Sequence, residues 1–235
     1  FLKVSLVIPT WNEIDGMKAI MPQINPDWVD QIIITDGGST DGTIEYAREH
    51  GYTVHVQRRK GFRFCYFEIL DLIEGDVVIT FSPDGNSIPE LIPELIEKMK
   101  EGHDMVIASR YKDDAKSEDD DIMTGFGNWL FTRTVTLLHG GNYTDVMVIY
   151  RAYRKQIIYD LDLDKDRSYT TPEFLFRCVL SWEPLLSVRA ANRKLKIAEI
   201  PGDEPPRIGG ERKLLVFQWG AGYYFQFLRE KFFWK

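Results

Sequence analysis

The chain has 235 residues, of which 44% are hydrophobic and 28% charged, and these values exclude a disordered or collagen-like chain. Its 29 basic and 36 acidic side chains give a net charge of −7, so we expect no nucleic acid partner unless there is a local basic patch. The length predicts one α/β domain with a short extension.

The cysteines and the chain ends bear on where the protein works. Cys65 and Cys178 are too few for a small secreted scaffold held by disulfides, so a reducing, cytoplasmic compartment is expected. Phe1 leads straight into a strand-like run, which does not suggest a signal peptide, and no run reaches the roughly 18 apolar residues of a membrane span. Because the chain starts without Met, a span beyond Lys235 stays open.

Strand-like and helix-like patterns alternate along the first half. Short apolar segments predict strands at residues 2–9, 31–35, 53–57, 76–81 and 105–108. Helical spacing lies between them, at residues 43–50, 62–73 and 89–101. This alternation predicts an α/β fold with a mainly parallel central sheet flanked by helices. Ligands of such sheets bind beyond the carboxyl ends of the strands, here after Ile8, Ile34 and Phe81.

The second half is less regular. Residues 112–121 (KDDAKSEDDD) favour a solvated loop, with a flap near a diphosphate as the alternative. Helices are predicted at residues 122–139 and 171–182, and strands at residues 144–150 and 194–200. An aromatic-rich helix is predicted at residues 214–235.

Aromatic and polar residues follow the first predicted strand. Pro9 ends the strand, and Trp11 and Glu13 come directly after it. An aromatic plane at a strand tip can stack on a nucleotide base, and a carboxylate or amide can pair with base edges. The alternative is a helix start at which Asn12 serves as the N-cap.

A glycine-rich segment, TDGGSTDGT, joins the second strand to the first helix at residues 35–43. Its glycines permit close backbone approach, and Asp36 at the strand tip could accept hydrogen bonds from uracil or ribose. Helix capping is the alternative role for Ser39, Thr40 and Asp41. Neither a G-x-G-x-x-G fingerprint nor the G-K-[ST] of a P-loop is present.

The fourth strand delivers Asp84 to the same edge of the sheet, with Asn86 two residues later. Oxygen ligands of this kind, together with substrate phosphates, make a half-site for a hard cation such as Mg²⁺. An Asx turn shaped by Pro83 and Gly85 is the alternative.

Together these segments resemble the family 2 glycosyltransferases, which have the GT-A fold. The resemblance rests on IPTWNE, TDGGSTDGT, SPDGNSIPE, ASRY and a late R-x-x-G-x-x-K, which span residues 4–213. Within the family the chain is most similar to the polyprenyl-phosphate glycosyltransferases of the dolichol-phosphate mannose synthase type. The resemblance implies a GT-A domain at residues 1–213, followed by the C-terminal helix at residues 214–235.

The resemblance also implies roles for single residues at the nucleotide and the metal. Asp84 would be the final acid of the DxD motif, contacting the nucleotide through Mg²⁺ or Mn²⁺, and Asn86 would face the same metal. The implied contacts to base and ribose are Pro9, Trp11, Glu13 and Asp36.

Basic side chains are implied at the diphosphate. Arg110, in the ASRY segment, would face the donor phosphates together with Arg207 and Lys213 of the late basic motif. Asp145 would lie near the acceptor and act with Arg110 in catalysis. A hydroxyl acceptor would need Asp145 as general base, whereas a phosphate acceptor is already anionic and needs none.

The chain departs from the family's pattern at two acids. The usual pair of aspartates reads Asp36-Gly37, and the first acid of DxD is Ser82, which leaves one certain carboxylate for the metal. Glu211 places a negative charge beside the late basic pair. A weaker metal site, or greater reliance on Arg and Lys, would follow.

The implied activity is an inverting, metal-dependent transfer of a sugar from a UDP- or GDP-sugar to a polyprenyl phosphate or a growing glycan, as in cell-envelope glycan biosynthesis. One alternative is a nucleotidyltransferase, although the IPTWNE segment lacks the glycine-rich basic loop usual in that class. The other is an inactive homologue that serves as a binding or scaffold subunit, which Ser82 and Gly37 favour.

The C-terminal helix mixes aromatic residues with Arg229, Lys231 and Lys235, which suits a membrane interface. Packing on the domain, or on the partner in a homodimer, is the alternative. We therefore expect a cytoplasmic protein, with peripheral contact at the cytoplasmic face of a membrane as one option for this helix.

Overall fold

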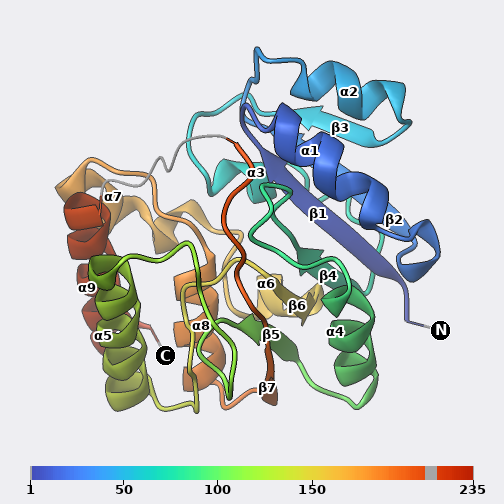
Figure 1. Cartoon of the computed structure of the whole chain (residues 1–235). Helices are drawn as coiled ribbons and strands as arrows, with labels where there is room; N and C mark the ends of the chain where they lie inside the picture. Colours follow the sequence, from blue (N-terminus) through green and yellow to red (C-terminus); the bar gives the residue numbers. More distant parts are fainter. Residues whose placement is uncertain (1, 210–215, 235) are drawn as a thin grey trace.

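The computed structural model describes residues 2–209 and 216–234 of the chain. Within these ranges the strands form one sheet in the order β3-β2-β1-β4-β6-β5-β7 (Figure 1). The strands are β1 Val4–Thr10, β2 Gln31–Asp36, β3 Thr53–Val56, β4 Val77–Thr80, β5 Met105–Ser109, β6 Arg151–Arg154 and β7 Ile197–Pro201. The α-helices are α1 Ile14–Ile20, α2 Thr43–Glu49, α3 Phe64–Phe67, α4 Leu91–Lys100, α5 Ile122–His139, α6 Gln156–Asp160, α7 Thr170–Phe176, α8 Glu183–Asn192 and α9 Val216–Phe233, with short 3₁₀ turns at Met21–Gln23, Pro26–Trp28 and Asp166–Ser168.

Every strand except β6 runs in the same direction. β1 pairs in parallel with β2 and β4, β2 with β3, and β5 with β7, whereas β6 is antiparallel to both β4 and β5. The carboxyl ends of β1, β2, β4 and β5 therefore lie along one edge of the sheet. The prediction of a mainly parallel α/β sheet is confirmed.

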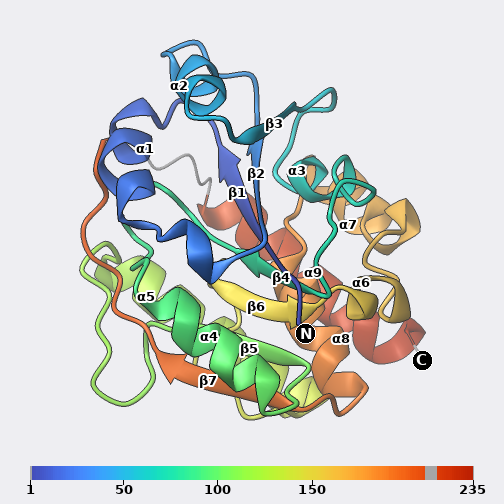
Figure 2. The same cartoon turned by 90° about the vertical axis from the view of Figure 1, so that its right-hand side faces the viewer.

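Helices cover both faces of the sheet, so its central strands are buried on both sides. Figure 2 shows α1 and α4 on one side and α3, α6 and α8 on the other. In β1, Leu6, Val7 and Ile8 are all fully buried, which is why this strand reads as an unbroken apolar run. Burial of each such side chain contributes about 1.5–3 kcal/mol.

The predicted strand at residues 144–150 is wrong, because this segment is irregular and the strand lies at Arg151–Arg154. The alternation that suggested a strand comes from the buried side chains of Val146, Val148 and Tyr150. The backbone N–H groups of residues 147 and 148 do not join a ladder, since both donate to the Asp145 carboxylate at 3.2 Å.

The predicted helix at residues 171–182 is shorter in the structure. α7 ends at Phe176, Arg177 takes a left-handed backbone conformation with φ of 50°, and α8 begins only at Glu183. The predicted helix at residues 62–73 is reduced to Phe64–Phe67, followed by turns. The left-handed backbone of Arg177 ends α7, so the helical sequence pattern continues beyond the last residue of this helix.

Helix α9 is part of the domain's core as far as it is described. Gln226, Phe227 and Glu230 are fully buried, and Glu230 pairs with the buried Arg189 of α8 at 2.7 Å. Figure 1 shows α5, α7 and α9 gathered at one end of the molecule. Packing on the domain is thus the alternative that the structure shows for this helix, and a membrane or dimer contact stays a prediction.

Neither cysteine forms a disulfide, and both are buried. Over the ranges given above, the search for a helix both long and apolar enough to cross a bilayer finds none.

Candidate active site

The loops after β1 and β4 touch because α1 packs directly on the segment that carries Asp84. A Cβ placed on Gly16 of α1 would lie 2.4 Å from the Pro83 carbonyl oxygen and 3.0 Å from the Asp84 Cα. Only glycine fits this approach without a shift of backbone. The first and third predicted segments therefore share one edge of the sheet.

The segment that follows β7 crosses over the same loop. The Ile208 N–H donates to the Asp84 carbonyl at 2.6 Å, and a Cβ on Gly85, whose φ is +95°, would lie 2.7 Å from Ile208. Arg207 reaches both strand tips, with Nη2 at 2.9 Å from Asp84 Oδ2 and Nη1 at 3.7 Å from Glu13 Oε1. The predicted late basic residue is thus brought to the predicted metal residue.

Arg110, at the tip of β5, is surrounded by carboxylates. It binds Asp145 in a bidentate manner, with Nε–Oδ2 at 2.7 Å and Nη2–Oδ1 at 3.1 Å. Its Nη1 also lies 3.3 Å from Asp120 Oδ2 and 3.3 Å from Glu204 Oε2. Although burial opposes the charged form, the charges of Asp145, Glu204 and Asp120 raise the pKa of Arg110 well above its ordinary value. The guanidinium therefore stays protonated.

Asp145 is fully buried and closed off from solvent. Its carboxylate accepts from Arg110 and from the backbone N–H groups of Met147 and Val148. In this arrangement Asp145 orients Arg110 and offers no open face to an acceptor hydroxyl. The predicted general base, Asp145, thus lies next to the predicted diphosphate residue, Arg110, but its carboxylate is occupied by hydrogen bonds that hold the local structure.

The charged stretch at residues 112–121 folds back onto the site at its end. Asp113, Asp114 and Glu118 are exposed, as expected of a solvated loop. Asp119 Oδ2, by contrast, accepts from Asn86 Nδ2 at 3.1 Å, and Asp120 accepts from the Tyr111 hydroxyl and from Arg110. This part of the loop therefore contacts the predicted site residues Asn86 and Arg110, and its role as a flap near a diphosphate stays a prediction.

Asp36 lies at the tip of β2, but its carboxylate is used within its own loop. It is fully buried and accepts from the N–H groups of Gly38 and Ser39 at 2.8 and 2.7 Å, and from the hydroxyls of Thr10 and Ser39, both at 2.7 Å. Asp36 thus shapes the turn against which a base could lie, rather than facing that base.

Trp11 is the exposed aromatic side chain of this region, with 51% of its surface accessible. A Cβ on Gly37 would lie 3.4 Å from Trp11, so the backbone of the β2 loop passes close to the indole. Asn12 does not cap α1; its φ is +55° and its Oδ1 accepts from the Thr40 N–H at 2.8 Å. The first two predicted segments are therefore adjacent.

Pro9 and Lys213 complete the set of predicted residues. Pro9 is half-buried at the end of β1, in register with Thr35 of β2. Lys213 lies outside the described residues.

Four side chains that support the site were not singled out from the sequence. Glu199 of β7 holds the residue before Asp145, accepting from the Thr144 N–H at 2.9 Å, and burial raises the pKa of Glu199. Arg151 is fully buried and donates to the carbonyls of Val146 and Val148. The other two are Asp119 and Glu204. Asp119 lies in a run of charged residues and Glu204 in a loop, so no local sequence pattern marked either of them as part of the site.

The residues at the tip of β4 fit a divalent cation because one buried oxygen there lacks a hydrogen-bond partner within the described ranges. Asn86 Oδ1 is buried and has no hydrogen-bond partner among the described residues, beside the Asp84 carboxylate that accepts the Asn86 N–H at 3.1 Å. A carboxylate and an amide oxygen are ligands that Mg²⁺ or Mn²⁺ accepts alongside substrate phosphates. Residues 2–209 and 216–234 contain no cluster of three His, Cys, Asp or Glu side chains able to hold a metal by themselves.

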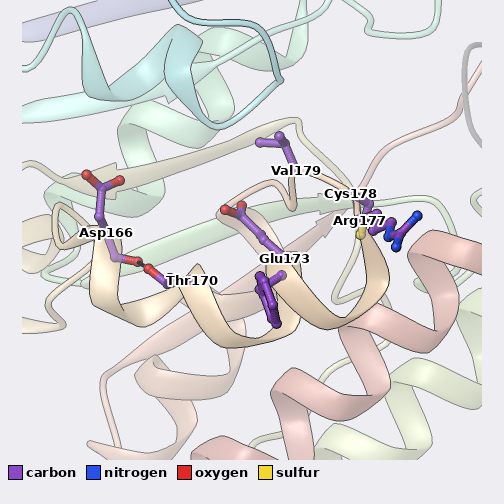
Figure 3. A pocket seen from close by; sticks show the side chains of 7 residues that line it. Asp166, Thr170, Glu173, Arg177, Cys178 and Val179 are labelled. Carbon is purple, nitrogen blue, oxygen red and sulfur yellow. Dashed lines mark hydrogen bonds between the residues drawn. The ribbon is translucent and has the colours of Figure 1, made fainter.

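Two cavities lie away from these residues. One, of about 570 Å³, runs along α7 (Figure 3) and is lined by Asp166, Thr170, Glu173, Phe174, Arg177, Cys178 and Val179. Its carboxylates are already paired, because Arg63 binds Asp166 at 2.6 Å and Glu173 at 2.7 Å. The other, of about 280 Å³, lies between the α4 start and the 113–115 loop. Neither includes a predicted site residue.

The sheet and the helices that flank it have the GT-A fold, and similar solved structures agree. Glucosyl-3-phosphoglycerate synthase from Mycobacterium tuberculosis, in complex with uridine diphosphate, matches with a TM-score of 0.70 and 18% identity over 98% of this chain and 80% of that one. A second structure of that enzyme, with Mn²⁺, uridine diphosphate and glucosyl-3-phosphoglycerate, gives 0.66 and 19%. At this identity the likeness shows the fold.

The sequence profile named Glycosyl transferase family 2 matches residues 5–162, and the chain belongs to this family. Among curated relatives, glycosyltransferase AglJ of Haloferax volcanii is 26% identical over 88% of this chain and 64% of its own length. Dolichol-phosphate mannosyltransferase of Pyrococcus furiosus is 27% identical over 91% of this chain and 59% of its own length. Dolichyl-phosphate hexose transferase of Haloferax volcanii is 27% identical over 94% and 90%. The chain thus spans less than two thirds of the first two relatives.

Proposed function

We propose that this protein transfers a sugar from a nucleoside diphosphate sugar to a polyprenyl phosphate, with inversion and with the help of Mg²⁺ or Mn²⁺. One observation carries the proposal: charged contacts link the tips of three strands. Arg207 joins Glu13 after β1 to Asp84 after β4, and the 119–120 segment joins Asn86 to Arg110 after β5. The basic side chains of this set would bind a diphosphate, and its carboxylates would bind a cation.

Each residue has a distinct task in this reaction. Trp11 offers its face to the base, and Arg207 and Arg110 bind the two donor phosphates. The contacts of Arg110 to Asp120 and Glu204, at 3.3 Å, are the longer ones, so phosphate oxygens would replace these while the 2.7 Å contact to Asp145 holds the guanidinium in place. When bound at Asp84 and Asn86, a divalent cation would neutralise charge that develops on the leaving nucleoside diphosphate.

The setting of Asp145 favours a phosphate acceptor over a hydroxyl. An acceptor hydroxyl must lose a proton and needs a base within hydrogen-bond reach, whereas a phosphate is already anionic near neutral pH. Asp145 is buried beneath Arg110 and its oxygens are occupied. The names of two relatives, dolichol-phosphate mannosyltransferase and dolichyl-phosphate hexose transferase, agree with this choice.

Exposed apolar side chains on α5, α7 and α9 support a lipid-linked acceptor. The first turns of α5 expose Ile122 at 95%, together with Phe126 and Trp129, whose rings stack at 5.7 Å. Phe174 of α7 is 81% exposed, and Phe233 near the end of α9 is also exposed. Aromatic and aliphatic side chains of this kind suit the interface of a bilayer. The contact first expected of the C-terminal helix alone would thus include α5 and α7.

The experiment is an assay of nucleoside diphosphate release. UDP- and GDP-sugars are supplied with a short polyprenyl phosphate and Mn²⁺, and the lipid product is followed by mass spectrometry. We expect turnover with one donor class, and a loss of about 10²–10³-fold in kcat for Asp84→Asn, which removes charge stabilisation of the leaving group. Asp114→Asn is the control. It also removes one negative charge, but from an exposed residue of the 112–121 loop, and it should retain activity.

Two results would contradict the proposal. Release of pyrophosphate instead of a nucleoside diphosphate would identify a nucleotidyltransferase. Absence of turnover with every donor, while the nucleotide still raises the melting temperature, would favour the scaffold subunit.

A further inference from the structure

The segment at the tip of β4 offers a cation only one carboxylate. Asp84 is 4% exposed, and its Oδ2 is engaged by Arg207 at 2.9 Å. Ser82, two residues earlier, is neutral, and Asn86 supplies a neutral amide oxygen. Magnesium sites in proteins commonly use one or two carboxylates besides substrate phosphates, so this half-site is poor in negative charge.

A second carboxylate reaches this place from a distant part of the chain. Asp119 is half-buried, and its Oδ2 lies 3.1 Å from Asn86 Nδ2, on the amide whose Oδ1 is buried without a partner among the described residues. No described Lys or Arg forms an ion pair with Asp119, whereas the adjacent Asp120 pairs with Arg110. A cation bound here would compensate the charge of the half-buried carboxylate and would give the unpartnered amide oxygen a partner.

The position of Asp119 is fixed by its neighbours in sequence. The Glu118 N–H donates to the Glu204 carbonyl at 2.9 Å, and the Glu204 N–H donates to the Lys116 carbonyl at 2.9 Å. The Ser117 hydroxyl donates to the Glu204 carboxylate, and Asp120 accepts from Tyr111. Contacts on both sides of Asp119 thus hold the loop against the segment after β7, so its carboxylate is directed toward Asn86 by the fold.

We propose that Asp119 is a further ligand of the divalent cation, in addition to Asp84 and Asn86, and that it supplies the acid that position 82 lacks. This inference rests on the proposed function, since it concerns the cation of that same site. The amide of Asn86 would present its oxygen to the cation, and the contact from Nδ2 keeps Asp119 beside it. Residues 112–121 then serve the metal site directly.

The test measures metal binding and does not depend on turnover. Mn²⁺ is titrated into the whole protein with saturating UDP and, separately, GDP, and free Mn²⁺ is read by electron paramagnetic resonance. Asp119→Asn keeps the shape and the acceptor oxygen for Asn86 but removes the charge. We expect it to weaken Mn²⁺ binding at least about tenfold. Asp114→Asn is the matched control on the same loop and should bind Mn²⁺ as the unmodified protein does.

A second variant separates a metal ligand from a merely structural residue. Ser82→Asp in the Asp119→Asn background returns one carboxylate to the β4 tip, so Mn²⁺ affinity should recover in the double variant. Melting temperatures of all variants, measured without metal, show that each is folded. Recovery would not follow if Asp119→Asn acted by loosening the loop.

The outcomes distinguish this inference from the function on which it rests. If the unmodified protein binds Mn²⁺ and Asp119→Asn binds it equally well, the assignment of Asp119 is overturned while the proposed function stands. If the unmodified protein binds no Mn²⁺ with either nucleotide, metal dependence of the proposed function fails, and this inference fails with it.

Discussion

Two fully buried carboxylates, Asp36 and Asp145, are stabilised in opposite ways at the same edge of the sheet. Asp36 accepts hydrogen bonds from neutral donors, namely two backbone N–H groups and two hydroxyls, three of them within three residues. Asp145 faces the guanidinium of Arg110, which lies 35 residues away in sequence. The first shapes its own loop and contacts Thr10 of β1, and the second ties the end of β5 to the irregular segment before β6.

The difference shows how the site divides its work. A carboxylate that accepts from neutral donors shapes the turn beside which Trp11 lies. A carboxylate paired with Arg110 holds a guanidinium whose Nη1 also donates to Asp120 and Glu204. Under the proposed function, the side that would face the base is built mainly from local sequence, whereas the side that would face the diphosphate is assembled from distant segments.

The largest effect is expected when the ion pair is broken. Asp145→Asn removes the charge that holds the buried Arg110, and we expect a loss of about 3 kcal/mol in the free energy of unfolding, because Arg110 retains only its longer contacts to Asp120 and Glu204. Chemical denaturation measures this loss. In a double-mutant cycle with Arg110→Gln, the two losses should be less than additive. Additive losses would show that the pair is not coupled and would remove one half of the comparison.

A smaller effect is expected at the carboxylate with neutral partners. Asp36→Asn replaces an acceptor oxygen by an amide that faces two donors, so we expect a loss of about 2 kcal/mol in the free energy of unfolding. Denaturation of Asp41→Asn, an exposed residue of the same loop, provides the control and should lose less. Equal losses for the two variants would mean that burial of Asp36 does not decide the outcome.

Glu68 combines both modes and is expected to give the smallest effect. Burial opposes its ionisation, but hydrogen bonds from His55 and from the Arg58 and Arg59 N–H groups lower the pKa of Glu68 to about 2. A lowered pKa in the folded state stabilises the protein above the ordinary value near 4.5, and this contribution is lost as the pH falls toward about 2. Glu68→Gln should therefore lose about 1–2 kcal/mol at pH 7 and almost nothing near pH 2. A difference between variant and unmodified protein that is constant from pH 7 to pH 3 would contradict this assignment.

The parts of the fold that the sequence predicts well are those with local patterns. The strands β1, β2, β4 and β5 were recognisable because apolar runs end in Pro, Asp or Ser at the sheet edge. Helix α8 was missed because nearly every residue from Glu183 to Ala191 is buried, so no polar face marks a helical period. The strand predicted at residues 144–150 was misplaced because Val146, Val148 and Tyr150 are buried in alternation without a ladder.

The site follows the same division. Trp11, Asp36 and Asp84 were found from the strand tips that carry them, and their proximity follows from the parallel sheet. Asp119 and Glu204 were not, since Asp119 meets Asn86 across 33 residues and Glu204 meets Arg110 across 94. The burial of Asp145 likewise depends on packing that no local pattern records. Roles that depend on long-range partners therefore had to wait for the fold.

Arg207 and Asp84 have a consequence for handling the protein. The guanidinium sits 2.9 Å from the carboxylate and so acts as an internal counter-ion in the absence of ligands. Chelating buffers should leave the chain folded, since Asp84 keeps Arg207 as its partner when divalent ions are withdrawn. Under the proposed function, Arg207 would release Asp84 when a divalent cation binds and would contact a donor phosphate instead.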